Sequence, residues 1–280
     1  MLSYRHAFHA GNFADVLKHW IQVEVLDYLK RKDKPFVYID THSGAGMYRL
    51  DSDEAQKNGE YQTGIGRLSA SEWPELAQYL DVVEAAQALA QNGEAVYPGS
   101  PWFTTHALRE KDKSYLFELH PRDFGLLEQL TYRDRRVQVR HEDGFKGLIS
   151  LLPTHIKRGL ILMDPPYEVK TDYQATVETL VAAHRRMATA TYALWYPVVE
   201  RSRIDELERA FQQSGIRNIQ LFELGIKADT EGRGMTASGM ILINPPYVLM
   251  EKAKVLLPRL SKFLSEDSQP HFRCDVLVPE

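Results

Sequence analysis

Cysteine is almost missing from this sequence, which has one cysteine, Cys274, among 280 residues. A disulfide within the chain is therefore excluded, and the composition gives no support to an oxidising compartment. Long apolar runs are missing as well, since the longest are strand-sized and far short of the roughly 18 residues that a membrane span requires. The first residues, MLSYRHAFHAGNF, contain no apolar core of a signal peptide. These absences predict a cytoplasmic protein that does not enter membranes.

A large excess of either charge is also missing. The chain has 34 Lys and Arg residues against 38 Asp and Glu residues, a formal net charge of -4. This balance argues against a protein that coats nucleic acid without specificity, but it allows an enzyme that combines a local basic patch with an acidic pocket. A hydrophobic content of 44% is enough for a full core in one large domain, or in one domain with a small insertion.

Short apolar runs alternate with stretches of helical spacing along most of the chain. Such runs suit strands that are covered on both faces, so the alternation predicts an α/β doubly wound sheet. The last two expected strands follow each other closely and are expected to form an antiparallel pair at an edge of the sheet. The expected strands are 36–40, 114–118, 137–140, 160–163, 192–196, 219–224 and 240–243, and the expected helices include 14–30, 122–130, 175–189 and 203–214.

Residues 47–97 interrupt this alternation of apolar runs and helical stretches. We expect no strand there, and tracts such as 75–80 and 82–91 have a helical composition. The stretch is much longer than the loops of ~2–6 residues that join the parts of a βαβ crossover. We therefore expect a core domain formed by residues 1–46 and 98–280, with residues 47–97 inserted as a helical subdomain.

The first candidate for ligand chemistry is the glycine loop, residues 40–46 (DTHSGAG), which directly follows the first strand. Gly44 and Gly46 would let the backbone turn sharply and approach a ligand at the carboxyl end of a strand, where open α/β sheets bind. A Gly-x-Gly pair is weak evidence alone, and an ordinary strand-to-helix turn explains it equally well. The full G-x-G-x-x-G pattern is absent, so nicotinamide binding is not favoured.

Acidic residues follow the next two strands. Glu118, at the end of the second strand, can accept hydrogen bonds from both ribose hydroxyls of an adenosyl group. Asp143, followed by Gly144, suits contact with the edge of an adenine and suits a simple turn equally well. Each site alone is also explained by an ordinary strand end.

Asp164-Pro165-Pro166-Tyr167 is the strongest chemical signal, and it directly follows an apolar strand. Two prolines fix two backbone dihedrals and leave carbonyl groups beside one carboxylate and one aromatic ring. The amine of adenine or cytosine is a poor nucleophile, because its lone pair is delocalised into the ring. Hydrogen bonds to Asp164 and the Pro165 carbonyl would aim that lone pair at an electrophilic methyl group, while Tyr167 stacks on the base. The motif predicts methylation of a base amine with S-adenosylmethionine, and its four residues are the predicted catalytic residues.

A second copy of this motif, residues 244–247 (NPPY), also follows an apolar strand. One of the two copies is expected to be a structural turn. The glycine loop, the two acidic sites and the first copy follow strands on one side of a switch point, whereas Asn244 follows the last expected strand, at the far edge. We therefore assign the chemistry to the first copy. Cys274 offers no activated thiolate for methylation of a ring carbon, which agrees with amine chemistry.

The N-terminal segment is dense in aromatic and cationic residues. This combination suits stacking on a base and contact with phosphate, and it equally suits ordinary polar residues at a helix start. Zinc binding is not favoured, because no cysteine accompanies the histidines and their spacing matches no common ligand set, so no metal site is expected. The residues concerned are Tyr4, Arg5, His6, His9, Lys18 and His19.

Several motifs, distributed over nearly the whole chain, together resemble one family. They are LSYRH (2–6), FHAGN (8–12), DVLKH (15–19), DTH (40–42), YPGSP (97–101), DPPY (164–167), LWYP (194–197) and GMTASGM (234–240). In these motifs the sequence is similar to the bacterial 23S ribosomal RNA adenine-N6 methyltransferases of the J type. The resemblance implies a Rossmann-like class I S-adenosylmethionine-dependent methyltransferase fold with an inserted helical subdomain. It also implies a monomer that acts on one adenine of 23S ribosomal RNA, either protein-free or in an early assembly intermediate.

The resemblance implies roles for individual residues. Asp164 would act at the amine, Tyr4 would contact the RNA with help from His6 and Lys18, and Tyr167 would stack on the base as the motif predicts. Cofactor contacts would come from His19, His42, Ser100, Glu118, Asp143, Gly144 and Asp164, in addition to the loop glycines Gly44 and Gly46.

Alternatives stay open at the level of the residues. The motif chemistry does not separate RNA from DNA, so a DNA adenine-N6 methyltransferase fits the same pattern. A protein-glutamine methyltransferase would use the copy at Asn244. A non-catalytic RNA-binding module would keep the fold with a decayed cofactor site.

Overall fold

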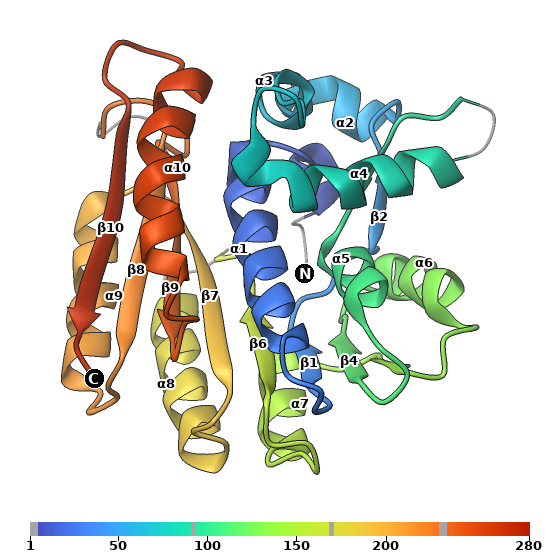
Figure 1. The fold of residues 1–280 in the computed structure, drawn as a ribbon, viewed down its shortest axis with the longest axis vertical. Helices are drawn as coiled ribbons and strands as arrows, with labels where there is room; N and C mark the ends of the chain where they lie inside the picture. Colours follow the sequence, from blue (N-terminus) through green and yellow to red (C-terminus); the bar gives the residue numbers. More distant parts are fainter. Residues whose placement is uncertain (1–4, 91–92, 168–170, 230–233) are drawn as a thin grey trace.

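An eight-stranded sheet runs through the centre of the protein, in a computed structural model that describes residues 5–90, 93–167, 171–229 and 234–280 (Figure 1). The order of strands across the sheet is β10-β8-β9-β7-β6-β1-β4-β5. The strands are β1 (Val37–Asp40), β4 (Lys113–Phe117), β5 (Val137–Arg140), β6 (Gly159–Met163), β7 (Thr191–Val198), β8 (Ile219–Gly225), β9 (Ala237–Ile243) and β10 (His271–Val278).

Five neighbouring strands, β7, β6, β1, β4 and β5, are parallel, and the other three are antiparallel to their neighbours. All seven expected strands are present with small shifts of their ends, and the antiparallel pairing of β8 with β9 is confirmed. The expectation that this pair forms the edge is wrong, because β10 pairs with the outer side of β8. The sequence of β10, HFRCDVLV, mixes exposed and half-buried residues, so it lacks the apolar run by which the inner strands were found.

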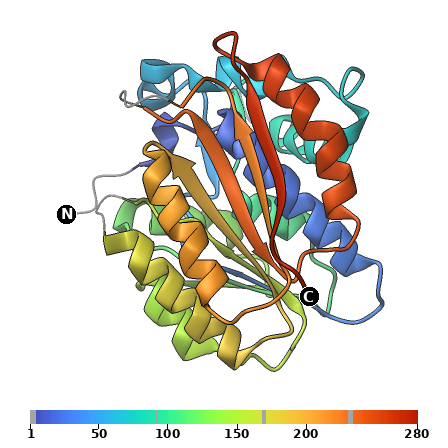
Figure 2. The same ribbon diagram turned by 90° about the vertical axis from the view of Figure 1, so that its left-hand side faces the viewer.

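Helices cover both faces of the sheet (Figure 2). Side chains of successive strand residues point to opposite faces, so in β1 Tyr38 joins the hydrophobic cluster on one face and Ile39 joins the cluster on the other. The first face is covered by α1 (Phe13–Lys30), α5 (Ser100–Ala107), α6 (Pro121–Thr131) and α10 (Leu249–Leu264), and the second by α7 (Gly144–Leu151), α8 (Thr171–Arg186) and α9 (Arg201–Gln213). Among the described helices, none combines the length and the apolar character that crossing a membrane requires.

The stretch 47–97 contains α2 (Asp53–Asn58), α3 (Glu60–Thr63) and α4 (Ala77–Leu89), which lie above α1 and α5 in Figure 1. It begins and ends with a two-stranded antiparallel ribbon, β2 (Met47–Arg49) and β3 (Val96–Pro98), so the expectation of no strand is wrong. Strands of three residues are too short to show a periodic pattern. Leu76 and Tyr79 are fully buried and belong to the same hydrophobic cluster as α1, so the helical stretch packs onto the core.

Candidate active site

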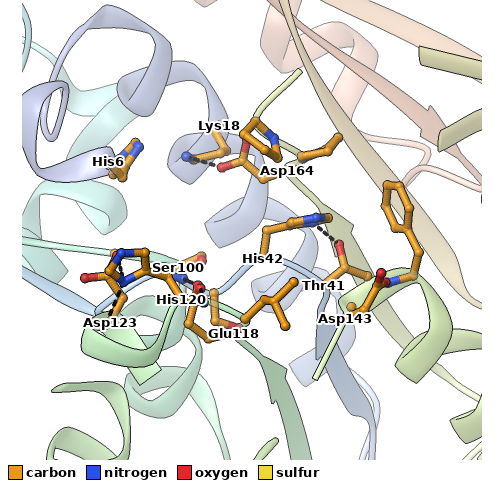
Figure 3. Close-up of a pocket in the computed structure, with 18 of the residues that line it drawn as sticks. His6, Lys18, Thr41, His42, Ser100, Glu118, His120, Asp123, Asp143 and Asp164 are labelled. Carbon is orange, nitrogen blue, oxygen red and sulfur yellow. Dashed lines mark hydrogen bonds and ion pairs between the residues drawn. The ribbon is translucent and has the colours of Figure 1, made fainter. Parts of the chain in front are cut away.

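A cavity of about 330 Å³ opens at the carboxyl ends of β1, β4, β5 and β6 (Figure 3). Its wall contains the loops that directly follow these four strands, together with residues from the start of α1 and of α5. Every residue predicted to bind the cofactor lines it except Gly46, and so do Pro165, Pro166, His6 and Lys18. Tertiary structure thus brings together lining residues as far apart in the sequence as His6 and Asp172.

This cavity lies at the switch point of the sheet. From β1 the chain proceeds outward to β4 and β5, whereas β6 lies on the other side of β1 and leads to β7. The prediction that all four loops lie on one side of the switch point is therefore wrong, because Asp164 faces the glycine loop across it. Loops that diverge from neighbouring strands leave a crevice between them, which is where open α/β sheets bind their ligands.

The second copy of the motif, at Asn244, lies at the opposite end of the sheet. Because β9 is antiparallel to β7, Ile243 pairs with Tyr192 near the start of β7, away from the cavity. The Asn244 side chain donates a hydrogen bond to the Ala190 carbonyl (2.9 Å), and the Tyr247 side chain is 75% exposed. This copy closes a turn, in agreement with the assignment of the chemistry to the first copy.

The glycine loop is held by Glu118. The Gly44 backbone N–H donates to one carboxylate oxygen of Glu118 (2.7 Å), and the His120 N–H donates to the other (2.7 Å). Burial raises the pKa of Glu118, while these two N–H groups oppose the shift. Gly44 has a φ of +61°, and a Cβ there would overlap the hydroxyl of Tyr48. A side chain at this position would therefore be strained and would displace the wall of the cavity.

Gly46 has a different place from the one that the Gly-x-Gly pattern suggested. It does not line the cavity, and a Cβ on it would contact the side chains of Leu130 and Leu127 at 2.7 and 3.0 Å. Its φ of +77° and its carbonyl, which accepts from the Gly99 N–H (3.0 Å), make it part of the turn into β2.

Asp143 and Gly144 start α7 at the far wall of the cavity. The Asp143 carboxylate caps the helix by accepting from the N–H groups of Phe145 (2.9 Å) and Lys146 (3.1 Å). Gly144 packs directly on the end of β1, where a Cβ would overlap the carbonyl oxygen of Thr41. The glycine therefore lets α7 approach the cavity loop closely.

Asp40, at the end of β1, lies beneath the loop and was not among the predicted site residues. Its fully buried carboxyl group accepts from the hydroxyls of Ser100 (2.6 Å) and Tyr38 (2.8 Å) and from the His42 N–H (3.2 Å). Burial raises the pKa of Asp40 to about 6 despite these three donors. Its position directly after an apolar strand is the signal that could have identified it. Asp40 ties β1, α5 and the loop together.

Histidines on two sides of the cavity are uncharged near neutral pH. Burial lowers the pKa of His42 to about 4, and its Nδ1 lies 2.8 Å from the hydroxyl of Thr41. Burial also lowers the pKa of His19 well below its usual range. The Nδ1 atom of His19 lies 2.7 Å from the Tyr97 hydroxyl, and its ring stacks on Phe103.

Asp164 is linked to the N-terminal segment by a chain of polar contacts that begins at Lys18 (Figure 3). The ammonium group of Lys18 lies 2.7 Å from Asp164 and 2.8 Å from Asp15, and His6 Nε2 lies 2.8 Å from the second oxygen of Asp15. Burial alone would lower the pKa of Lys18, but the two carboxylates outweigh it and the pKa is raised. Lys18 is therefore a permanent cation that fixes the Asp164 carboxylate at the cavity. Asp15, buried at the start of α1, was not predicted to take part.

The aromatic residue of the motif lies beside the cavity wall without being part of it. The Tyr167 hydroxyl donates to the Trp195 carbonyl (2.8 Å), and its ring centroid lies 4.4 Å from that of Tyr173. Its φ of +50° turns the chain sharply after the two prolines. Tyr4, the predicted RNA contact, lies outside the described residues.

The donor set of this cavity fits an adenosyl cofactor. A carboxylate at the end of the second core strand suits a ribose, and the neutral His19 and His42 suit uncharged ligand groups. Gly44 and Gly144 allow close packing of the wall, where a Cβ would overlap neighbouring atoms. A cavity at the switch point of a doubly wound sheet with an antiparallel β8–β9 pair, bordered by DPPY, defines a class I S-adenosylmethionine-dependent methyltransferase.

Comparison with known proteins identifies the particular family. The family model described as "Ribosomal RNA large subunit methyltransferase D, RlmJ" matches residues 33–278, so the chain belongs to this family of methyltransferases and uses S-adenosylmethionine. It is 48% identical, over the whole of both chains, to "Ribosomal RNA large subunit methyltransferase J" of Escherichia coli (strain K12). The protein of the same description from Haemophilus influenzae is 43% identical, again over the whole of both chains.

A solved structure supports the fold. The crystal structure of a Legionella pneumophila protein is 34% identical, and the match covers 96% of this chain and 98% of that chain with a TM-score of 0.85. The predicted fold class is therefore confirmed. The roles of the individual site residues stay predictions.

Proposed function

We propose that this protein transfers a methyl group from S-adenosylmethionine to N6 of one adenine in 23S ribosomal RNA. The observation that supports this most directly is the Asp164 carboxylate, which Lys18 holds beside the two prolines at the cavity. The ribosomal RNA substrate is supported by the family and by the printed names of the two relatives.

Asp164 and the Pro165 carbonyl act on the amine. Lys18 engages Oδ2 of Asp164, and within the described ranges Oδ1 accepts no hydrogen bond from the protein, so Oδ1 can accept one from the amine. A second N–H of the amine donates to the Pro165 carbonyl. The two contacts orient the nitrogen lone pair toward the cavity, and this alignment supplies most of the rate enhancement. Tyr167 supports the base by stacking, and Tyr4, His6 and Lys18 contact the RNA.

The residues that line the cavity hold the cofactor. Glu118 would accept from the ribose hydroxyls, beside the loop at Gly44. Asp143 and Gly144 would hold the adenine, and His19, His42 and Ser100 would complete the contacts. S-adenosylmethionine, when bound, supplies the electrophilic methyl group. Because its pKa is lowered to about 4, His42 would add no positive charge to the cavity that would hold the cofactor.

The wider assignments are part of the same proposal. Residues 1–46 and 98–280 form the catalytic core, residues 47–97 form the inserted helical subdomain, and the protein acts as a monomer in the bacterial cytoplasm, where ribosomes assemble. Its substrate is protein-free 23S RNA or an early assembly intermediate.

The test compares matched changes in the two copies of the motif. Asp164→Asn keeps the shape of the side chain but removes the charge, and we expect a loss of methyl transfer of at least 100-fold, of the order known for a single preorganised electrostatic contact. Tyr167→Ala should reduce transfer, whereas the equivalent Tyr247→Ala, at an exposed ring, should leave it unchanged. Undiminished turnover of Asp164→Asn with normal cofactor binding would refute the proposed role.

The acceptor is tested separately. Transcribed 23S RNA and duplex DNA of the same sequence are offered to the wild-type protein, and the modified base is mapped by nuclease digestion. Methylation of DNA in place of RNA would favour the DNA methyltransferase alternative. Calorimetry that shows no binding of S-adenosylmethionine would favour a non-catalytic RNA-binding module.

A further inference from the structure

The end of the sheet opposite the cavity carries a cluster of cations. It is formed by the segments that precede β1, β4 and β5, three adjacent parallel strands whose first residues lie side by side. The segment before β1 follows the lower end of α1 in Figure 1. We call this cluster the basic edge, and its exposed members are Lys32, Lys34, Lys111, Lys113, Arg133 and Arg135.

Two half-buried arginines, Arg109 and Arg136, join the three segments into one surface. The guanidinium of Arg109 donates to the carbonyls of Lys32 (3.0 Å) and Lys34 (2.8 Å), which ties the second segment to the first. Arg136 donates to the Leu108 carbonyl, which ties the third segment to the second. These contacts fix the backbone of the basic edge, so its cations are held close together.

Two of the four acids in the same segments pair with the arginines that join them. Asp112 is fully buried and pairs with Arg109 (2.9 Å), and Asp134 pairs with Arg136 (2.6 Å). Among the described residues, no carboxylate lies within ion-pair distance of any member of the basic edge. The remaining exposed acids of these segments are Asp33 and Glu110. The basic edge is therefore a concentrated positive patch on a protein whose net charge is -4.

An exposed aromatic ring accompanies these cations. The side chain of Tyr132 is 68% exposed, and the guanidinium of Arg133 lies 5.1 Å from its ring centroid. Cations interleaved with an exposed aromatic ring are typical of surfaces that contact nucleic-acid backbones and unpaired bases.

The inserted subdomain has the opposite character. Residues 47–97 contain nine acidic and three basic side chains, a net charge of -6, so the other parts of the chain carry +2. Phosphate groups are repelled by such a surface, and attraction is concentrated at the basic edge.

We propose that the basic edge is a second RNA contact surface, which binds phosphates of 23S RNA away from the target adenine. This rests on the proposed function, because it takes ribosomal RNA as the substrate. The edge and the cavity are separated by the length of β4, five residues or roughly 16 Å at about 3.3 Å per residue. A long RNA can therefore reach both at once. Phosphate contacts of this kind position an RNA without reading its sequence.

The test is a charge reversal at the edge with a matched control. Lys32→Glu/Lys34→Glu changes the net charge as much as Lys254→Glu/Lys262→Glu, at exposed lysines of α10. We measure the affinity of each variant for transcribed 23S RNA over a series of salt concentrations. The edge variant should bind about tenfold more weakly, with a salt slope smaller by about 1.4–1.8 for two lost phosphate contacts. The control variant should stay within about threefold of wild type.

Further measurements separate this proposal from the proposed function. Turnover at saturating RNA, affinity for S-adenosylmethionine and the thermal unfolding temperature should match wild type in the edge variant. Lys32→Gln/Lys34→Gln should show an intermediate affinity. The proposal would be overturned if the edge variants bound 23S RNA with wild-type affinity, or if the control variant lost as much affinity as the edge variant. The basic edge would then be expected to bind an acidic partner other than this RNA. Failure of the wild-type protein to methylate any RNA would instead refute the proposed function.

Discussion

Replacement of Gly144 by alanine tests whether the close packing of α7 on β1 shapes the cofactor cavity. A Cβ at this position would overlap the carbonyl oxygen of Thr41 and would lie 2.6 Å from its carbonyl carbon and 2.8 Å from its Cα. All three atoms belong to the backbone, so no flexible side chain can move aside. The first turn of α7 must therefore move away from the loop that follows β1.

The loss of stability expected for Gly144→Ala follows from overpacking. Forcing one methyl group into a packed site costs typically about 1–3 kcal/mol, and more where the neighbours are rigid. Gly125→Ala is the matched control, because this glycine lies inside α6 and a Cβ on it would meet nothing within 4 Å. That change should stabilise the protein by about 0.5–1 kcal/mol, since alanine is the better helix former.

The assay combines chemical denaturation with calorimetric titration of S-adenosylmethionine. Gly144→Ala should lower the free energy of unfolding and also weaken cofactor binding, because Gly144 and Thr41 both line the cavity. Gly125→Ala should leave binding unchanged. A Gly144→Ala protein with wild-type stability and wild-type affinity for S-adenosylmethionine would refute the argument. It would show that α7 can move away from the loop after β1 without loss of free energy.

Other perturbations test the charged groups. Lys18→Met should lower the free energy of unfolding by about 3–5 kcal/mol, because it leaves the buried Asp15 without its ammonium partner. Arg201→Leu should cost a similar amount, because the Glu223 carboxylate is fully buried and bonded to that guanidinium (2.8 Å), yet cofactor affinity should not change. The pKa of His42 is lowered by burial from 6.5 to about 4, so the unfolded chain takes up this proton first. The stability advantage of wild type over His42→Gln should therefore shrink as the pH falls from 6.5 to 4.

Controls for these changes are present in the chain. Lys254→Met and Arg203→Leu each remove one partner of an exposed ion pair, with Glu251 and Glu200, and should cost less than about 1 kcal/mol in denaturation experiments. The reasoning would be contradicted if substitutions at the buried and the exposed ion pairs lowered the free energy of unfolding equally. A pH-independent difference between wild type and His42→Gln would show that burial does not control this histidine.

Much of the fold could be predicted because its inner strands are covered on both faces. In the sequence, such strands are unbroken runs of apolar residues. Strand β5 was predicted with the bounds that the structure shows. Strand β10 was missed because it lies at an edge, where seven of its eight residues are exposed or half-buried and polar side chains interrupt the apolar run. The ribbon of β2 and β3 was missed because its stability comes from pairing between distant residues and not from local pattern.

The candidate site was predictable where chemistry depends on residue type at the end of a strand. Asp164, Glu118 and Asp143 were predicted in this way, and all three line the cavity. Asp15 was not, because its importance comes from burial beside Lys18, which no local pattern reports. Gly46 was assigned to the cofactor from its spacing, whereas the structure uses it to turn the chain into β2.

The sequence by itself predicted the chemistry that we propose for this protein. A carboxylate, two prolines and a tyrosine after an apolar strand define how an amine can be oriented, because those properties belong to the residues themselves. Only the tertiary structure decided which copy of the motif borders the cavity. The two copies have nearly the same local sequence, but β6 is parallel to β1 and β9 is antiparallel to β7, so the chain places their turns at opposite ends of one sheet. Strand direction is a property of long-range pairing, which neighbouring residues do not encode.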